Sequence, residues 1–359
     1  MQMLNFTVGP VQMDEETMNL GKEPVPYFRT EEFSKIMLKN EQLICNFAKT
    51  EEESRAVFIT GSGTASMEAS VLNFFNNKDK ILVVNGGSFG TRFVQICETL
   101  KLNYSEIKLS IGESLEKSQL SQFENKGYTA LVLQHHETST GVLYDLSMVG
   151  EFCKKNNLFL LVDCISSFLA EEIDMQKMKI DAIIIGSQKA IALPPGISCI
   201  IMNKRGVERV YNNNISSVYF DLKSYLKDGE RGQTPFTPAV QILLQLHEKL
   251  NRIEREGGTE KLILEVKKRA EYFRNSIHDL PFTLVAKNPS HAVTALFSKN
   301  LDAKKILNIM KDEYHIWLCP NGGELANTIF RVGHIGTITK QQMDLMICAL
   351  QKTVNKLRG

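Results

Sequence analysis

The chain has 359 residues, of which 43% are hydrophobic, enough for about two globular domains with large cores. Its 42 Lys and Arg residues balance 41 Asp and Glu residues, so no net charge attracts nucleic acid or an anionic membrane. Seven scattered cysteines without a C-x-x-C pair, no signal-peptide pattern and no long apolar run predict a cytoplasmic protein with no metal site and no membrane span.

Helical periodicity alternates with short β-branched runs, which predicts a three-layer α/β domain with a mostly parallel sheet. Before it, residues 1–15 form an irregular arm, in which Gly9 and Pro10 predict a turn. Strands are predicted at residues 56–60, 80–84, 103–107, 130–134, 158–162, 181–185 and 197–202, and helices at 31–49, from 62–64, 89–100, 146–156 and 239–256. The later strands are apolar throughout, as buried parallel strands are.

Gly257 and Gly258 predict a helix end and a domain boundary. The large domain therefore covers residues 16–256, and a smaller C-terminal α+β domain covers residues 257–359. Within the small domain, helices are predicted at 260–278, 303–314 and 340–356, and strands at 282–286, 293–297 and 328–332.

Lys189 follows a buried strand and precedes a Pro-Pro-Gly turn, at the strand end where α/β folds bind ligands. Burial would lower the pKa of such an amine and make it a nucleophile for aldehyde chemistry. Asp163 ends another apolar strand, and a buried carboxylate there needs a partner such as a protonated pyridine nitrogen. The alternatives are a solvated surface lysine and an aspartate that only caps the following turn.

Two glycine-rich turns precede predicted helices. In the first, Ser62, Gly63 and Thr64 offer backbone amides and a helix N-terminus, which form an anion site that suits a phosphate. The loop lacks both the Walker lysine and the third glycine of the dinucleotide fingerprint. In the second, Phe89 begins a helix and could stack on a flat ring or belong to the core.

Two further segments carry polar groups. HHETSTG places Thr138 where it could bond to a ring substituent, whereas adjacent histidines in a strand point apart and suggest no metal site. Arg331 lies in an otherwise apolar strand, where a buried cation needs an anionic partner. Its planar guanidinium can donate two parallel hydrogen bonds to a carboxylate of the substrate. An internal salt bridge is the alternative.

Together GSGT, GGSFG, HETSTG, VDCISS, GSQKA with PPG, and FRVGHIG occur in the order and spacing of class V, fold-type I aminotransferases, and the resemblance covers nearly the whole chain. FRVGHIG with GSGT-x-S-x-EA most resembles the 2-aminoethylphosphonate–pyruvate transaminases. Serine– and alanine–glyoxylate aminotransferases are the alternative within the same class.

This resemblance implies pyridoxal 5′-phosphate as cofactor, a small-molecule amino donor, a 2-oxo acid, and a homodimer with shared active sites. It implies Lys189 as the Schiff-base lysine and Asp163 as the partner of the pyridinium nitrogen. The implied cofactor-binding residues also include Ser62, Gly63, Thr64, Phe89, Thr138 and Gln188, with Thr237 from the second subunit. The implied substrate-binding residues are Arg331, Gly9 and Arg29.

Departures from the family pattern bear on the substrate. Phe89 stands where alanine–glyoxylate enzymes have tryptophan, and residues 27–33 read YFRTEEF where degradative aminoethylphosphonate enzymes have a Trp-Asp-rich stretch. Arg29 in that segment is expected to be a free cation for a second anionic group. Cysteine desulfurases share the fold, but no cysteine here lies in a predicted Gly/Ser-rich loop. A non-catalytic binding protein is disfavoured by the presence of both Lys189 and Asp163.

Overall fold

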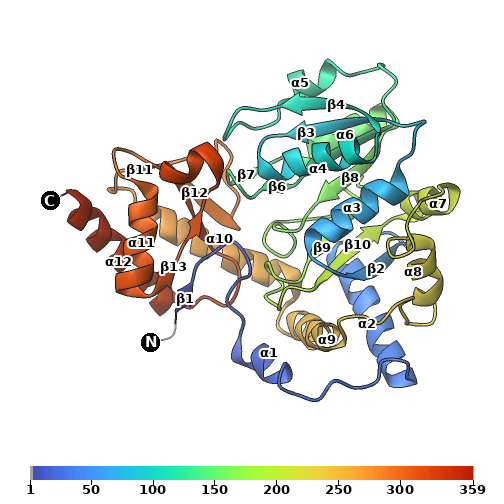
Figure 1. Cartoon of the computed structure of the whole chain (residues 1–359), viewed down its shortest axis with the longest axis horizontal. Coiled ribbons are helices and arrows are strands. Elements are labelled where there is room, and N and C mark those ends of the chain that lie inside the picture. Colours follow the sequence, from blue (N-terminus) through green and yellow to red (C-terminus); the bar gives the residue numbers. More distant parts are fainter. Residues whose placement is uncertain (1–2, 359) are drawn as a thin grey trace.

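The computed structural model describes residues 3–358, so residues 1, 2 and 359 of the predicted arm and small domain lie outside it. The large sheet has seven strands in the order β2-β10-β9-β8-β5-β3-β4 (Figure 1). Their bounds are β2 Arg55–Thr60, β3 Lys80–Asn85, β4 Asn103–Lys108, β5 Ala130–Gln134, β8 Phe159–Asp163, β9 Ala182–Gly186 and β10 Ile197–Met202. The pairs from β4 to β9 are parallel, which confirms the mostly parallel sheet.

Strand β10 corrects one prediction, because it pairs antiparallel with both β9 and β2. A parallel pair needs a crossover connection of a dozen or more residues, usually with a helix. Only the short loop with the Pro-Pro-Gly turn joins β9 to β10, so the chain reverses direction there. The apolar sequence of β10 indicates that the strand is buried on both faces, but it does not indicate whether the strand runs parallel or antiparallel to its neighbours.

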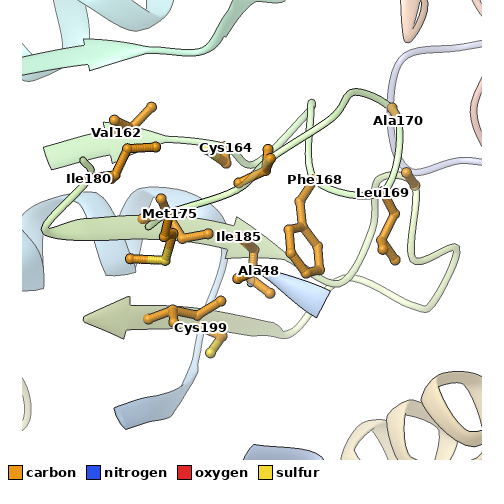
Figure 2. Close-up of a cluster of buried hydrophobic side chains, with 14 of the residues drawn as sticks. Ala48, Val162, Cys164, Phe168, Leu169, Ala170, Met175, Ile180, Ile185 and Cys199 are labelled. Atoms are coloured by element: carbon orange, nitrogen blue, oxygen red, sulfur yellow. The ribbon is translucent and has the colours of Figure 1, made fainter. Parts of the chain in front are cut away.

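Helices cover both faces of the large sheet, so the domain has three layers. Ile184 packs in one core with helices α3, α4, α7 and α8, whereas its neighbour Ile183 packs in the other with α2, α6 and α9. Figure 2 shows part of the second core, where Val162, Ile185 and Cys199 lie in one cluster. The bounds are α2 Glu31–Phe47, α3 Gly63–Phe74, α4 Ser88–Thr99, α6 Leu146–Lys155, α7 Lys204–Asn212, α8 Leu222–Gly229 and α9 Val240–Arg255.

A second, four-stranded antiparallel sheet lies beside the first, in the order β11-β12-β15-β14 (Figure 1). It consists of β11 Phe282–Leu284, β12 Val293–Ser298, β14 Cys319–Pro320 and β15 Ile329–Gly333, with helices α10 Gly258–Ser276, α11 Ala303–Tyr314 and α12 Lys340–Arg358 and the 3-10 helix η1 Gly323–Asn327. The proposed domain boundary at residues 256 and 257 falls between α9 and α10. No helix among residues 3–358 is long and apolar enough to cross a membrane.

The N-terminal segment connects the two sheets. Its strand β1, Leu4–Asn5, pairs with β13, Ile316–Trp317, and the Gly333 amide donates to the Phe6 carbonyl at 2.7 Å. Further along, the Val11 amide donates to the Gln188 carbonyl at 3.3 Å. The segment therefore passes from the small sheet to the loop that carries Lys189. The prediction of an irregular arm is wrong at Leu4–Asn5, because these residues pair with β13 as strand β1. Other elements not predicted from the sequence include α7, α8 and β14, and the short α1 Glu15–Leu20, α5 Lys117–Ser121, β6 His136–Glu137 and β7 Val142–Leu143.

Candidate active site

The sequence-predicted polar residues gather at the carboxyl ends of the large sheet's strands. Asp163 is the last residue of β8, and Lys189 follows the end of β9 by three residues. Helices α3 and α4 begin directly after β2 and β3. Because neighbouring parallel strands end at one edge of a sheet, segments far apart in sequence meet there.

Lys189 is a buried amine, which excludes the alternative of a solvated surface charge. Its side chain is 8% exposed, and Nζ donates to the Val8 carbonyl at 2.7 Å. Burial lowers the pKa of Lys189 to about 8; the nearby Arg331 charge contributes to this lowering, and the Asp163 carboxylate opposes it. A Cβ added at Gly9 would lie 2.8 Å from Cδ of Lys189, so the predicted Gly9 lies directly against the lysine chain.

Asp163 is 5% exposed, and burial raises its pKa to about 7, while Lys189 acts in the opposite direction. Its Oδ1 accepts from the Ile165 amide at 2.8 Å, so the residue does cap the following turn. No group among residues 3–358 donates a hydrogen bond to Oδ2. One carboxylate oxygen is therefore available to a cationic or N–H partner, and the cap and the cofactor contact are compatible roles.

The start of α3, where the sequence predicts an anion site, has backbone amides without intrahelical acceptors. Ser62 is the N-cap but makes no side-chain cap bond. A Cβ at Gly63 would come within 2.4 Å of Ile165 Cδ1, so a side chain at this position would have to displace Ile165. Gln188 Oε1 is buried and lacks a hydrogen-bond partner in residues 3–358. The amides at the start of α3 are donors that suit a phosphate, which helix N-termini bind well, whereas Gln188 Oε1 can only accept a hydrogen bond.

Phe89 lies in the first turn of α4 and is half-buried. A residue that sequence reasoning missed fixes this turn: Glu137 is fully buried, and its Oε2 accepts from the amides of Phe89 and Gly90, each at 3.2 Å. Burial raises the pKa of Glu137, and hydrogen bonds from Ser139 oppose that rise. The only available signal was a charged residue inside the otherwise uncharged HETSTG motif.

Thr138 is buried and belongs to a chain of hydrogen bonds. Its hydroxyl donates to Ser166 Oγ at 2.7 Å, and Ser166 Oγ lies 2.9 Å from Nδ1 of His136. Burial lowers the pKa of His136 to about 3 and that of His135 to about 4, so both rings are neutral. No group of three potential metal ligands occurs in the described part of the chain.

Arg331 lies across the seam between the two sheets. From β15, its Nη1 donates to the Thr138 carbonyl at 3.0 Å, and its Nη2 donates to the Pro320 carbonyl at 2.6 Å. Within residues 3–358 it has no carboxylate within 4.0 Å, so the alternative of an internal salt bridge is wrong. Its neighbour across the strand pair is Cys319, which was not predicted as a site residue.

Arg29 and Thr237 are not joined to the Lys189 cluster by any hydrogen bond within the described residues. Arg29 is exposed, but it is not the free cation that we expected: it donates to Gln233 Oε1 and to the carbonyls of Thr234 and Pro235. These acceptors precede Thr237, which is itself exposed. The sequence could not show this contact, because the two segments are about two hundred residues apart.

The arrangement fits pyridoxal phosphate. A buried amine with a lowered pKa suits an aldehyde, a buried carboxylate with one oxygen available suits a pyridinium N–H, and the free amides of α3 suit a phosphate. The fold and these residues define a pyridoxal-phosphate-dependent enzyme.

The chain belongs to the aminotransferase class-V family, whose sequence model matches residues 26–333. It is 30% identical to the "Soluble hydrogenase 42 kDa subunit" of Anabaena cylindrica, over 97% of this chain and 92% of that one. It is 28% identical to a bifunctional phosphonoacetaldehyde hydrolase/aminoethylphosphonate transaminase of Clostridioides difficile, over 88% of this chain and half of that protein. An alanine–glyoxylate aminotransferase structure from Nostoc sp. superposes with a TM-score of 0.92 at 25% identity, covering 98% of this chain and 95% of that one. The names describe different activities, so they establish the family and not the substrate.

Proposed function

We propose that the enzyme transaminates between 2-aminoethylphosphonate and pyruvate, giving phosphonoacetaldehyde and alanine, or the reverse. The observation that carries this proposal is the state of Arg331. Its guanidinium donates to two main-chain carbonyls, its Nε is buried without a partner, and no carboxylate of residues 3–358 neutralises it. A guanidinium fork can pair with a carboxylate or with a phosphonate, and ping-pong transamination requires one pocket to accept both substrates in turn.

The Clostridioides difficile relative supports this substrate pair, because one of the two activities in its name is that of an aminoethylphosphonate transaminase. The second candidate is serine or alanine with glyoxylate, and the similarity to the alanine–glyoxylate enzyme of Nostoc supports it. With these substrates Arg331 would bind only carboxylates, so binding of a phosphonate separates the two candidates.

Lys189, Asp163 and Thr138 have different roles in the proposed reaction. Pyridoxal phosphate, when bound, supplies an aldehyde that condenses with amines and a ring that withdraws electrons from the substrate carbon. Lys189 holds and moves a proton at Nζ, since its lowered pKa places the neutral amine within reach of ordinary pH. Asp163 would keep the ring nitrogen protonated through Oδ2. The Thr138 hydroxyl would contact the 3′-oxygen region.

The remaining residues position the cofactor in this proposal. Ser62, Gly63, Thr64 and Gln188 would hold its phosphate, and Phe89 would stack on its ring. Gly9 admits the backbone of the N-terminal arm to the lysine, where the Val8 carbonyl orients Nζ. These contacts hold the reacting groups in place, and this positioning reduces the entropy lost in the reaction.

We also propose a homodimer in which the Thr237 loop of each subunit reaches the cofactor phosphate of the other. Large apolar side chains next to this loop are exposed in the single chain. Tyr27 is 68% exposed and Val218 is 80% exposed, and Tyr219 stacks on Phe236 at 5.1 Å between ring centroids. Clusters of exposed apolar residues are typical of protein interfaces.

Sedimentation velocity at micromolar concentration tests the dimer, and a fully active monomer would contradict it. Mixed dimers then test the sharing. Lys189→Ala and Thr237→Ala subunits, when combined, rebuild one complete site only if Thr237 acts across the interface. Recovery of cofactor affinity in the mixture supports sharing, whereas no recovery places Thr237 in the site of its own chain.

We propose a cytoplasmic location from the state of the cysteines. All seven cysteines are unpaired, and five of them are buried. Unpaired buried thiols are typical of reducing compartments. Fractionation of the source cells tests this location.

The decisive test of the substrate is a half-reaction screen. The visible absorption of the purified enzyme is followed while 2-aminoethylphosphonate, alanine, serine or aspartate is added, and then pyruvate or glyoxylate. We expect 2-aminoethylphosphonate with pyruvate to have the highest kcat/KM. If serine or alanine with glyoxylate exceeds this pair tenfold, the substrate assignment is wrong while the cofactor chemistry stands.

A further inference from the structure

Arg92 connects two parts of the candidate site that the sequence treats as separate motifs. It lies one turn after Phe89 on α4, and its guanidinium carbon is 5.1 Å from the centroid of the Phe89 ring. Its Nη1 also donates to Thr64 Oγ1 at 3.0 Å, at the start of α3. Among residues 3–358, no carboxylate lies within 4.0 Å of this half-buried guanidinium.

The direction of the Arg92–Thr64 hydrogen bond is unambiguous, because a guanidinium has only N–H donors. The Thr64 oxygen must accept, which leaves the Thr64 hydroxyl proton free to donate elsewhere. A hydroxyl that accepts from a cation is a stronger donor, since hydrogen bonds in a chain polarise one another. Thr64 is also the second residue of α3, where the helix amides lack intrahelical acceptors. Its hydroxyl proton and these amides are therefore suited to the same anion.

The first turn of α4, which precedes Arg92, is held in place by Glu137. The buried Glu137 carboxylate accepts from the amides of Phe89 and Gly90, so the first turn of α4 is anchored to the strand end that carries Thr138. The Phe89 ring and the Arg92 guanidinium are presented together by this anchored turn. Stacking of a guanidinium on an aromatic face stabilises both orientations.

We propose that Arg92 is a positioning residue that couples the phosphate site at α3 to the aromatic ring of Phe89, and that it acts on the cofactor phosphate through the Thr64 hydroxyl. It thereby adds positive charge to that site without contacting the phosphate itself. This inference rests on the proposed assignment of Thr64 to the cofactor phosphate, and it does not depend on the identity of the amino donor.

The test compares the binding of pyridoxal phosphate and of pyridoxal, which lacks the phosphate, to cofactor-free protein. Dissociation constants are measured by fluorescence for wild type, Arg92→Met, Arg92→Lys, Thr64→Val and the double variant Arg92→Met/Thr64→Val. Loss of one charge-assisted hydrogen bond should weaken pyridoxal phosphate binding about tenfold in Arg92→Met. Pyridoxal binding should change less than about twofold, and Arg92→Lys, which keeps the charge, should recover part of the affinity. In the Thr64→Val background, Arg92→Met should have little further effect.

A matched control is Arg209→Lys, at the other end of α3. Arg209 also stacks on a phenylalanine, with its guanidinium carbon 4.8 Å from the Phe159 ring centroid, and it donates to the Phe74 carbonyl. Its replacement should leave the ratio of the two dissociation constants unchanged.

The results distinguish the role of Arg92 from the assignment of Thr64 to the cofactor phosphate. Equal weakening of both ligands in Arg92→Met, or no weakening of either, overturns the action through Thr64. If Thr64→Val discriminates between the ligands and Arg92→Met does not, only the role of Arg92 fails. If Thr64→Val fails to discriminate, the assignment of Thr64 to the phosphate is itself wrong. Thermal unfolding of each variant identifies losses that are due to misfolding, and in that case Arg92→Lys carries the decision.

Discussion

The two halves of the candidate site differ in how their charged groups are satisfied. Lys189 and Asp163 lie at strand ends of one sheet, are almost fully buried, and have pKa values that burial moves toward neutrality. Arg331 comes from the other sheet, is partly exposed, and is held by the Thr138 and Pro320 carbonyls. The first half is built into a rigid core and suits the chemistry that the family shares. The second spans the seam between the two sheets.

The largest effect is expected from Lys189→Ala. Transamination and the visible absorption band should both disappear, because in the proposed function the amine is the nucleophile for the cofactor aldehyde and the group that moves the proton. Absorbance spectra and turnover assays measure this loss. Lys155→Ala, on the surface and paired with Glu124, is the control and should leave both unchanged. An unaltered spectrum and rate in Lys189→Ala would remove the basis of the assignment.

Asp163→Ala should retain cofactor but lose turnover by roughly three orders of magnitude, since the ring nitrogen would no longer be held protonated. Single-turnover kinetics with a saturating amine measures the chemical step. The amide of Asp163→Asn keeps the bond from Ile165 but not the charge, so it should be nearly as slow as alanine. Turnover close to wild type in either variant would mean that Asp163 is only a turn cap.

Asp163 should also make the stability of the cofactor-free protein depend on pH. Because burial raises its pKa from 3.8 in the unfolded chain to about 7, the folded state binds the extra proton between these values. This contribution therefore becomes less favourable as the pH rises from about 4 to about 7, by at most about 4 kcal/mol. Urea unfolding of wild type and Asp163→Asn at several pH values measures it. The two proteins should differ in slope across that window, and parallel curves would contradict the raised pKa.

A smaller loss is expected from Arg331→Lys. Lysine keeps the charge but cannot reproduce the two-pronged geometry, so kcat/KM should fall in both half-reactions by about 1–3 kcal/mol. The half-reactions are measured separately with amino donor and 2-oxo acid. If only one half-reaction falls, Arg331 does not serve both substrates, and Arg29 becomes the next residue to test for the second anion.

The sequence alone determined the layered fold and the position of Asp163 and Lys189 at the ends of buried strands. Period-two and period-3.6 patterns report burial on sheets and helices, and the apolar runs before Asp163 and Lys189 showed that both would lie at buried strand ends. In the sequence, Gly63 indicated that another group approaches the backbone closely at this position. In the structure that group is the Ile165 side chain. These signals are local, and local chain geometry suffices to produce them.

Only the tertiary structure decided which partners these groups meet. The antiparallel direction of β10 follows from a short connection, not from its residues. Three hydrogen bonds join segments that are between about 28 and 205 residues apart. They run from the Phe89 amide to the Glu137 carboxylate, from Arg92 to the Thr64 hydroxyl, and from Arg29 to the Thr234 carbonyl. Such pairings depend on how strand ends and loops meet in space. A single sequence does not encode them in any periodic pattern, because each residue's own neighbours along the chain are unaffected by them.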